Sequence, residues 1–313
     1  MADNIKVHPS DYPDTVDVRT EEISSVHYPV YIAADKNGNL TDATNPQFVA
    51  AQFVDENGAA YGVKHIGNKP RVSAMPYLFD IAEGNVSNHT AIIVNGHNPD
   101  VGTSDETIWQ EGGAYAWPTS AAQLTVSSSD ANDDSGGSGA ETVTVYGLDE
   151  DYEEINETVT LDGQTGVTTT NSYLRIQSLQ VASAGATGSN EGIVYIGTGE
   201  ITDGKPATVY GLIAIGHNRS EHGWWTVPAG NTFYMVQGDA STDSNKGTEI
   251  DFYIRESGGL FTLRYNIHLF SGNAVVPFTM PFKVEAKSDI EVRAVAAQAG
   301  GSISAVFHGW YET

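Results

Sequence analysis

Short apolar runs separated by turn residues make up most of the chain. Clusters of Gly, Ser, Thr, Asn and Asp interrupt β-branched and aromatic stretches, which is typical of an all-β protein. In residues 251–255 and 290–295 apolar and polar side chains alternate, and this predicts a sheet with one buried face. The predicted strands are 27–33, 90–94, 141–146, 157–161, 173–181, 193–197, 209–215, 232–237, 249–255, 260–269, 284–286, 289–296 and 302–311.

Helix signals are few. Asn45 suits a helix cap and Pro46 suits the first helical position, but the apolar run that follows, up to Val54, can equally form a strand. Tyr77–Glu83, followed by Gly84, predicts a second short helix. The sequence therefore predicts a mainly β protein with very little helix, built as antiparallel β-sandwich or jelly-roll-like domains.

The distribution of these segments predicts three parts. Residues 1–75 hold short, irregular segments and predict an N-terminal arm or a small docking domain. Residues 76–200 predict a first β-domain, and 201–313 predict a C-terminal β-sandwich of the jelly-roll type. The turn-rich stretch Gly197–Pro206 is the predicted boundary between the two β-domains.

Composition narrows the classes of partner. The chain has 313 residues, 40% of them apolar, as in a globular protein. Its 40 acidic and 15 basic residues give a net charge of -25. Nucleic acids and anionic membranes are bound by clustered Lys and Arg, so this charge argues against both partners. An acidic surface suits exposure to salty water, because salt screens the self-repulsion.

Other features suggest where the protein folds. The chain contains no cysteine, which leaves no disulfide and no thiolate site and favours a reducing cytoplasm. The first residues lack the basic region and apolar core of a signal peptide. No apolar run reaches the roughly 20 residues that a transmembrane helix needs. We therefore expect assembly in a cytoplasm and no membrane insertion.

One acidic loop has the spacing of a calcium site. Asp130, Asn132, Asp134 and Glu141 fall at the ligand positions of an EF-hand loop. Ser135, however, stands where that loop needs glycine, and the residues that follow predict a strand instead of a helix. We favour the alternative, an exposed hairpin tip that binds no cofactor, and keep structural calcium as a testable hypothesis.

The sequence gives no sign of a catalytic site. The acidic run 149–157 favours a solvated connection over a pair of glycosidase carboxylates, which must converge from separate strands. His217 and His222 lie five residues apart, which is no zinc spacing, so a surface loop is the default interpretation. Nucleophile-elbow, P-loop and dinucleotide-binding motifs are absent. We expect a protein that is not an enzyme.

Aromatic residues are the other candidates for binding. Trp109, Tyr115 and Trp117 form one group, and Trp224 and Trp225 form a second. Exposed rings of this kind stack on sugars or anchor a partner protein. Buried rings belong to the core. We favour burial or a subunit interface over a carbohydrate site.

Several stretches together resemble virion structural proteins of tailed bacteriophages, especially those of marine bacteria. The resemblance spans most of the chain and lies in turns and strands, so it implies a role class but no reaction. The segments that carry it are Val18–Tyr31, Gly96–Trp109, Tyr115–Thr119, Ser127–Asp134, Val143–Asp149, Glu157–Gly163, Thr169–Ile176, Thr226–Gly230 and Pro281–Arg293.

The resemblance implies a non-enzymatic protein on the particle exterior, in capsid decoration, a fibre or a tail accessory. It implies homo-oligomers, with a trimer expected by analogy. The N-terminal arm would bind capsid or tail proteins, with Val26, His27, Tyr28 and Tyr31 as candidate contacts. The alternative hypothesis is binding of a host-surface polysaccharide. A polysaccharide-degrading enzyme and a secreted binding module are minor alternatives.

Overall fold

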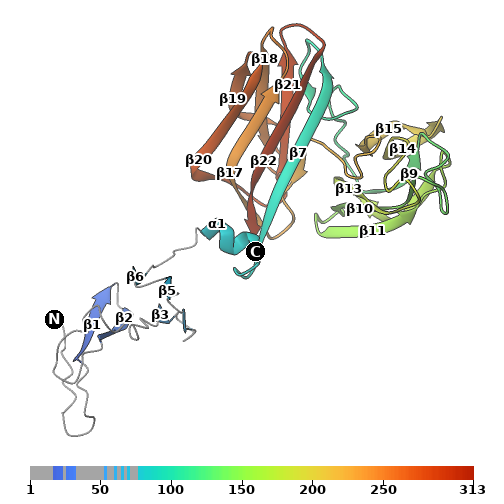
Figure 1. Cartoon of the computed structure of the whole chain (residues 1–313). Helices are drawn as coiled ribbons and strands as arrows, with labels where there is room; N and C mark the ends of the chain where they lie inside the picture. Colours follow the sequence, from blue (N-terminus) through green and yellow to red (C-terminus); the bar gives the residue numbers. More distant parts are fainter. Residues whose placement is uncertain are drawn as a thin grey trace. The chain divides into compact units, whose positions relative to one another are not determined.

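The computed structural model describes residues 77–313 and the backbone of six short strands before them. The chain separates into two compact units, Met1–Tyr77 and Leu78–Thr313 (Figure 1). The strands of the first unit form three antiparallel pairs, β1 with β2, β3 with β4 and β5 with β6. Their bounds are Asp17–Ile23, Val26–Ile32, Phe53–Val54, Ala60–Tyr61, His65–Ile66 and Lys69–Pro70.

Two sequence predictions concern the helices. Helix α1 spans Tyr77–Ala82, which confirms the short helix predicted there, and Gly84 follows with a φ of 73°. Of the other candidate helix, Phe53–Val54 is strand β3, and residues 45–52 lie outside the described residues. No described helix has the length and hydrophobicity needed to cross a membrane.

The second unit contains a body of two antiparallel sheets, one of four strands and one of five, here called the jelly-roll body. One sheet has the order β20-β17-β22-β7, and the other has the order β16-β21-β18-β19, with β8 also paired to β21. The bounds are β7 His89–Val101, β8 Glu106–Thr107, β16 Trp224–Thr226, β17 Thr232–Thr242, β18 Thr248–Arg255, β19 Thr262–Leu269, β20 Gly272–Val284, β21 Asp289–Ala296 and β22 Gly301–Glu312.

The strand order of this body is that of a jelly roll. When β8 and β16 are counted together as the second strand, the two sheets read 1-8-3-6 and 2-7-4-5 in chain order. The prediction of a mainly β protein with antiparallel sheets is confirmed. Strand β20 was predicted only at its end, 284–286, because Pro277 and Pro281 lower the strand signal of the preceding residues.

The second strand position is built from two distant pieces of chain. Thr107 of β8 lies opposite Arg293 of β21, and Trp224 of β16 lies opposite Glu291. Between them, the N–H of Ile108 donates to the carbonyl of Val292 at 3.0 Å, and the N–H of Val292 donates to Gly223 at 2.7 Å. Residues 109–222 therefore leave this sheet and return to it at almost the same point.

Most of that excursion forms a second β-body, here called the inserted body. Its sheets have the orders β11-β10-β13 and β12-β9-β14-β15. Figure 1 shows it beside the jelly-roll body. The bounds are β9 Ala122–Ser128, β10 Ala140–Leu148, β11 Glu154–Thr160, β12 Val167–Tyr173, β13 Arg175–Ala184, β14 Val194–Thr202 and β15 Lys205–Ile213.

This topology bears on the predicted domains. The predicted boundary turn, Gly197–Pro206, lies inside the β14–β15 hairpin, and both strands belong to the inserted body. Strand β7 lies before that body in sequence but pairs with β22 near the C-terminus, for example Val94 opposite Phe307. The division at residue 200 stays a prediction, whereas the sheets group residues 122–213 together.

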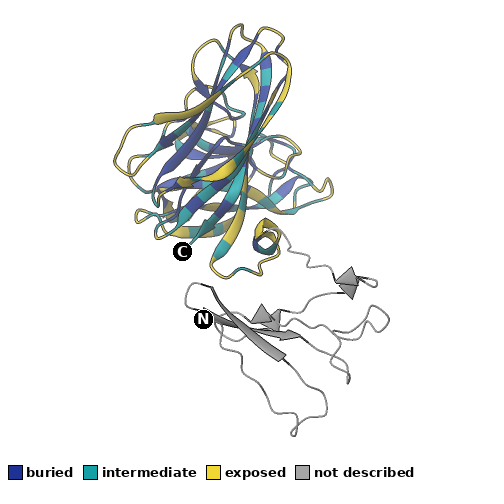
Figure 2. Ribbon diagram, turned by 90° about the vertical axis from the view of Figure 1, so that its left-hand side faces the viewer, coloured by how far each residue is buried: buried dark blue, intermediate teal, exposed yellow. Residues whose placement is uncertain are grey.

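Each β-body has its own apolar core between its two sheets. Phe233, Phe252 and Phe307 pack in the core of the jelly-roll body, and Val126, Val145 and Leu179 pack in that of the inserted body. Figure 2 shows the buried positions along the inner strands. The alternation predicted for residues 251–255 places Phe252 and Ile254 in the core, as expected for period-two side chains.

Candidate functional site

The predicted aromatic residues meet where the two β-bodies join. Trp109, Tyr115 and Trp224 are buried in a third apolar cluster, together with side chains of β14 and β15. Tyr115 stacks on Trp224 with ring centroids 3.9 Å apart, and Trp109 meets Trp224 edge-on at 5.3 Å. Trp225 points to the other side and packs in the jelly-roll core. The interpretation of these four rings as buried residues therefore agrees with the structure.

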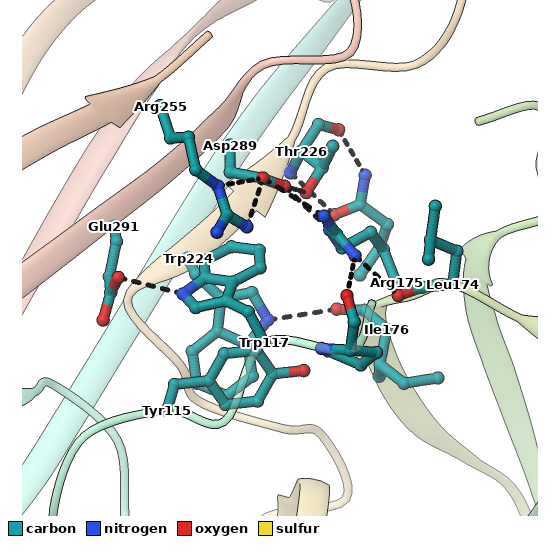
Figure 3. Close-up of polar contacts among 12 residues, drawn as sticks. Tyr115, Trp117, Leu174, Arg175, Ile176, Trp224, Thr226, Arg255, Asp289 and Glu291 are labelled. Atoms are coloured by element: carbon teal, nitrogen blue, oxygen red, sulfur yellow. Dashed lines mark hydrogen bonds and ion pairs between the residues drawn. The ribbon is translucent and has the colours of Figure 1, made fainter. Parts of the chain in front are cut away.

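Polar side chains surround Trp117 at the same junction, and Figure 3 shows this arrangement. Asp289 of β21 accepts hydrogen bonds from Arg175 at 2.8 Å, from Arg255 at 2.6 Å and from Thr226 at 2.6 Å. Trp117 Nε1 donates to Glu291 at 3.0 Å. We call these six residues the junction cluster: Trp117, Arg175, Thr226, Arg255, Asp289 and Glu291.

The junction cluster also holds its cations against aromatic rings. The guanidinium groups of Arg175 and Arg255 lie 5.1 and 4.9 Å from the Trp117 ring centroid. Arg255 lies 4.4 Å from Phe261 as well. Cation–π contacts of this kind add to the ion pairs when water is excluded. Asp289 pairs with both arginines, and Glu291 pairs with Arg293 at 2.9 Å, so each charge of the cluster has a partner, which suits a structural joint between the two bodies.

The alternating pattern of β21 was predicted to send polar side chains to solvent. Glu291 is instead 1% exposed and Asp289 is 3% exposed. The inserted body covers this face of the sheet, and Arg175, Thr107 and Trp117 supply the hydrogen bonds that the buried carboxylates need. The alternation of residues within β21 could not reveal that this face is buried, because the residues that bury it lie more than a hundred positions away in the sequence.

The acidic loop is organised around Asp133, which is not one of the predicted calcium ligands. Asp133 is completely buried, and its carboxylate accepts from Ala140 N at 2.7 Å, Glu191 N at 2.9 Å and Gly192 N at 2.8 Å. Ser128 Oγ donates to it at 2.5 Å. These bonds fasten the loop to the segment before β14.

The predicted calcium ligands have other roles or none. Asp130 accepts the N–H of Asn132, and the Asn132 amide donates to Glu191. Among the described residues, the side chains of Asp134 and Glu141 make no hydrogen bond to them, and within residues 77–313 no group of three or more His, Asp or Glu is arranged to hold a metal. The hairpin interpretation was wrong, because β9 and β10 belong to different sheets and the loop crosses between them.

The N-terminal candidates Val26, His27, Tyr28 and Tyr31 lie on β2, opposite β1, with Tyr31 facing Val18 in the register. The structure describes only the backbone of these strands. Their proposed contact with other particle proteins stays a prediction.

A surface that sequence reasoning missed lies along β19 and β20. The stretch Ser257–Val284 contains no Asp or Glu, although the chain has 40 acidic residues among 313. Leu260, Phe270 and Met280 are 86%, 72% and 83% exposed. Half of the exposed large apolar side chains of the described residues fall in this stretch. The depletion of acid is visible in the sequence and could have identified it.

These strands form one edge of the jelly-roll body. Among the described strands, β19 pairs only with β18, and β20 pairs only with β17, so both sheets end here. The ring centroids of Tyr265 on β19 and Phe278 on β20 lie 6.1 Å apart, so side chains of the two sheets meet at this edge. Figure 1 shows β19 and β20 at the same side of the jelly-roll body. We call this surface, formed by Ser257–Val284, the acid-free edge.

The charges on the acid-free edge are basic and few. Arg264 pairs with Glu256, Lys283 pairs with Glu285, and His268 lies near Glu249, so each partner carboxylate lies outside the stretch. Aromatic and Met side chains with few charges are typical of the centre of a protein interface. Exposed sheet edges are also sites where another chain can pair.

A groove lies on another side of the junction between the two bodies. Its volume is about 450 Å³, and its lining includes Ile93, Asn95, Tyr146, Arg219 and Glu221. His222, which is buried, also lines it and stacks on Trp224 at 4.1 Å. Burial lowers the pKa of His222 from 6.5 to about 4, so its ring is neutral at pH 7.

Comparisons with known proteins do not identify a family for this chain. No protein-family model matches the chain, and no curated protein matches it significantly. Among solved structures, it is similar to the VP2 subviral particle of infectious bursal disease virus, with 10% identity over 76% of this chain and 82% of that one and a TM-score of 0.18. The Gx strain structure of the same virus gives 10% identity, coverage of 72% and 76%, and a TM-score of 0.17. Similarity at this level does not indicate a shared function.

Proposed function

We propose that this chain is a non-enzymatic structural protein of a virion that assembles with further copies of itself on the exterior of a tailed-phage particle. Decoration of the capsid, a fibre and a tail accessory are the roles that fit. The observation that carries the proposal is the acid-free edge, where large apolar side chains are exposed on a chain of net charge -25. The sequence resemblance to phage virion proteins supports the kind of particle.

Charge favours a second copy as the occupant of this edge. Two copies of a chain with charge -25 repel each other wherever acidic surfaces meet. At the acid-free edge that repulsion is smallest, and Leu260, Phe270 and Met280 offer apolar area whose burial stabilises contact. Soluble monomers seldom expose large contiguous apolar patches. Closed symmetric assembly is the common outcome for identical chains, and we propose a trimer.

The N-terminal residues 1–75 have a separate role in this proposal. They belong to the first compact unit, which ends at Tyr77. An arm that binds capsid or tail proteins would leave the acid-free edge available for contacts between copies. The protein would then be located on the virion surface, after assembly in the host cytoplasm.

A density map of the intact particle tests the proposal, because it gives location, copy number and neighbours together. We expect density for this fold on the particle exterior, with the β19–β20 edge covered by a neighbouring copy. A particle that lacks the protein, or one in which the edge faces solvent in every copy, would contradict the proposal.

A further inference from the structure

The groove between the jelly-roll body and the inserted body has the properties of a ligand site. Its volume of about 450 Å³ lies in the range of small-molecule sites. Strand β7 contributes Ile93 and Asn95, strand β10 contributes Tyr146, and the loop before β16 contributes Arg219 and Glu221. Glu154 of β11, Gln177 of β13 and Trp225 of β16 also line it, so segments from both bodies meet around one space.

One part of the groove is apolar although it is exposed. Ile93 is 61% exposed and Tyr146 is 39% exposed, and both line the space. An aromatic ring beside an aliphatic side chain packs well against the C–H face of a sugar ring, because that face is apolar while the ring edge carries hydroxyls. Ile93 lies on β7, at the opposite end of the sheet that ends in β20, and Tyr146 lies on β10 of the inserted body, so this pair lies apart from the acid-free edge.

Hydrogen-bonding groups in the groove are held in fixed positions. The Glu221 carboxylate accepts from Asn95 Nδ2 at 3.1 Å and from Gln110 Nε2 at 2.7 Å, and His217 Nδ1 lies 3.0 Å from it. These contacts orient the Asn95 amide, whose oxygen can accept a further hydrogen bond. Fixed polar groups beside an apolar wall orient a polyhydroxylated ligand.

Arg219 is the residue that points to an anionic ligand. Arg175, Arg255, Arg264 and Arg293, the other arginines in residues 77–313, all pair with carboxylates. The exposed side chain of Arg219 has no ion pair or hydrogen bond to the described residues. Its planar guanidinium matches a carboxylate, which it can bind through two parallel hydrogen bonds.

His222 lies buried at the floor of the groove with one ring nitrogen unpartnered. His222 Nε2 lies 2.8 Å from the carbonyl oxygen of Gln177, and Nδ1 has no partner among the described residues. Because the ring is neutral, Nε2 carries the proton for that bond and Nδ1 is left as an acceptor.

We propose that this groove binds a uronate residue of an acidic polysaccharide. Arg219 binds the carboxylate, Tyr146 and Ile93 contact the apolar face of the sugar ring, and Asn95 accepts from a hydroxyl. The carboxylates of Glu154 and Glu221, which also line the groove, and the negative charge of the chain oppose a polyanion. At about 0.15 M salt the screening length is about 8 Å, so the distant charges are screened and binding depends on direct contact of the sugar carboxylate with Arg219. The inference is independent of self-assembly.

Calorimetric titration tests it with three probes: a short oligogalacturonate, a neutral galacto-oligosaccharide of equal length, and acetate. We expect the oligogalacturonate to bind at least about tenfold more tightly than either of the others. Arg219→Ala should weaken that binding about tenfold or more, and Tyr146→Ala should weaken it several-fold. Arg219 and Tyr146 are exposed, so both variants should keep the wild-type circular dichroism.

Lys246→Ala is the matched control, because it removes one exposed positive charge in the β17–β18 connection, outside the groove. It should keep oligogalacturonate binding within a factor of two. Equal affinity for the neutral oligosaccharide, affinity for acetate as high as for the uronate, an unaffected Arg219→Ala variant, or no binding at millimolar concentrations would each overturn the proposal.

Discussion

Arg175 of β13 and Asp289 of β21 form a buried ion pair that joins the inserted body to the jelly-roll body. Arg175 Nε lies 2.8 Å from Asp289 Oδ1, and the two side chains are 6% and 4% exposed. Arg255 binds the other carboxylate oxygen at 2.6 Å. One carboxylate thus compensates two guanidinium groups, and the second sheet of the jelly roll is tied to the insertion that interrupts it.

Asp289→Ala should therefore destabilise the chain strongly. Removal of the carboxylate leaves Arg175 buried without its partner, which costs about 3–5 kcal/mol. Urea unfolding followed by tryptophan fluorescence measures the change. Glu256→Ala, which removes the exposed partner of Arg264, is the control and should cost less than about 1 kcal/mol. Equal effects of the two substitutions would contradict the role of the junction cluster.

Gly96→Ala should destabilise the point where the interrupted strand rejoins. A Cβ at Gly96 would lie 2.5 Å from Gly223 N and 2.7 Å from the carbonyl oxygen of Ile108. Backbone must shift to accept the methyl group, and such overpacking costs about 1–3 kcal/mol. Gly238→Ala in β17 is the matched control, since the nearest atom to its Cβ is 4.0 Å away. Thermal unfolding that ranks Gly238→Ala as the worse variant would contradict this account.

Asp133→Asn tests the interpretation of the acidic loop. The carboxylate now accepts hydrogen bonds from backbone N–H groups, among them those of Ala140 and Gly192. The asparagine amide would replace one of its oxygens with an NH₂ group, which cannot accept them. We expect a loss of about 2–4 kcal/mol of unfolding free energy, because buried donors are left unpaired. Asp134→Asn is the control: its side chain makes no hydrogen bond to the described residues, so the unfolding free energy should change by less than about 0.5 kcal/mol.

A chelator supplies the second arm of this test. If hydrogen bonds to Asp133 organise the loop, excess EDTA should leave the melting temperature unchanged. A fall in the melting temperature that calcium restores would support a calcium site at Asp130, Asn132, Asp134 and Glu141 instead.

His222 should make stability depend on pH. Burial lowers the pKa of its ring from 6.5 to about 4, so between these values the unfolded chain binds a proton that the folded chain does not. The unfolding free energy is therefore complete above about pH 6.5 and falls as the pH decreases towards 4, by about 3 kcal/mol from this residue. Urea unfolding at pH 7, 6 and 5 should show a shallower dependence for His222→Gln. An identical dependence in both proteins would contradict the assignment.

Local patterns were sufficient for the strands but not for their arrangement. Alternation at Phe252 and Ile254 predicted a buried face because the period of a strand is two. The joining of Thr107 and Trp224 along one partner strand involves residues 117 positions apart (224 − 107). No local pattern encodes such a pairing, so the insertion could not be predicted.

For the candidate sites too, the sequence predicted local features but not contacts between distant residues. Burial of Trp109 and Trp224 could be anticipated from their size and neighbours, whereas the ion pair of Arg175 with Asp289 joins residues 114 apart. Spacing suggested Asp130 and Asp134 as ligands, but the buried acid is Asp133 between them. Which carboxylate turns inward depends on the donors of Glu191 and Gly192, which come from a distant loop.

The oligomeric state in solution tests the central claim most directly. Light scattering coupled to gel filtration should give the mass of an oligomer, with a trimer expected, for the wild-type chain. The double variant Phe270→Asp with Met280→Asp places charge on the acid-free edge and should elute as a monomer with unchanged circular dichroism. Ile215→Asp, at an apolar position that is 60% exposed and lies outside the edge, should stay oligomeric. A monomeric wild type, or a double variant with the wild-type mass, would contradict assembly through this edge.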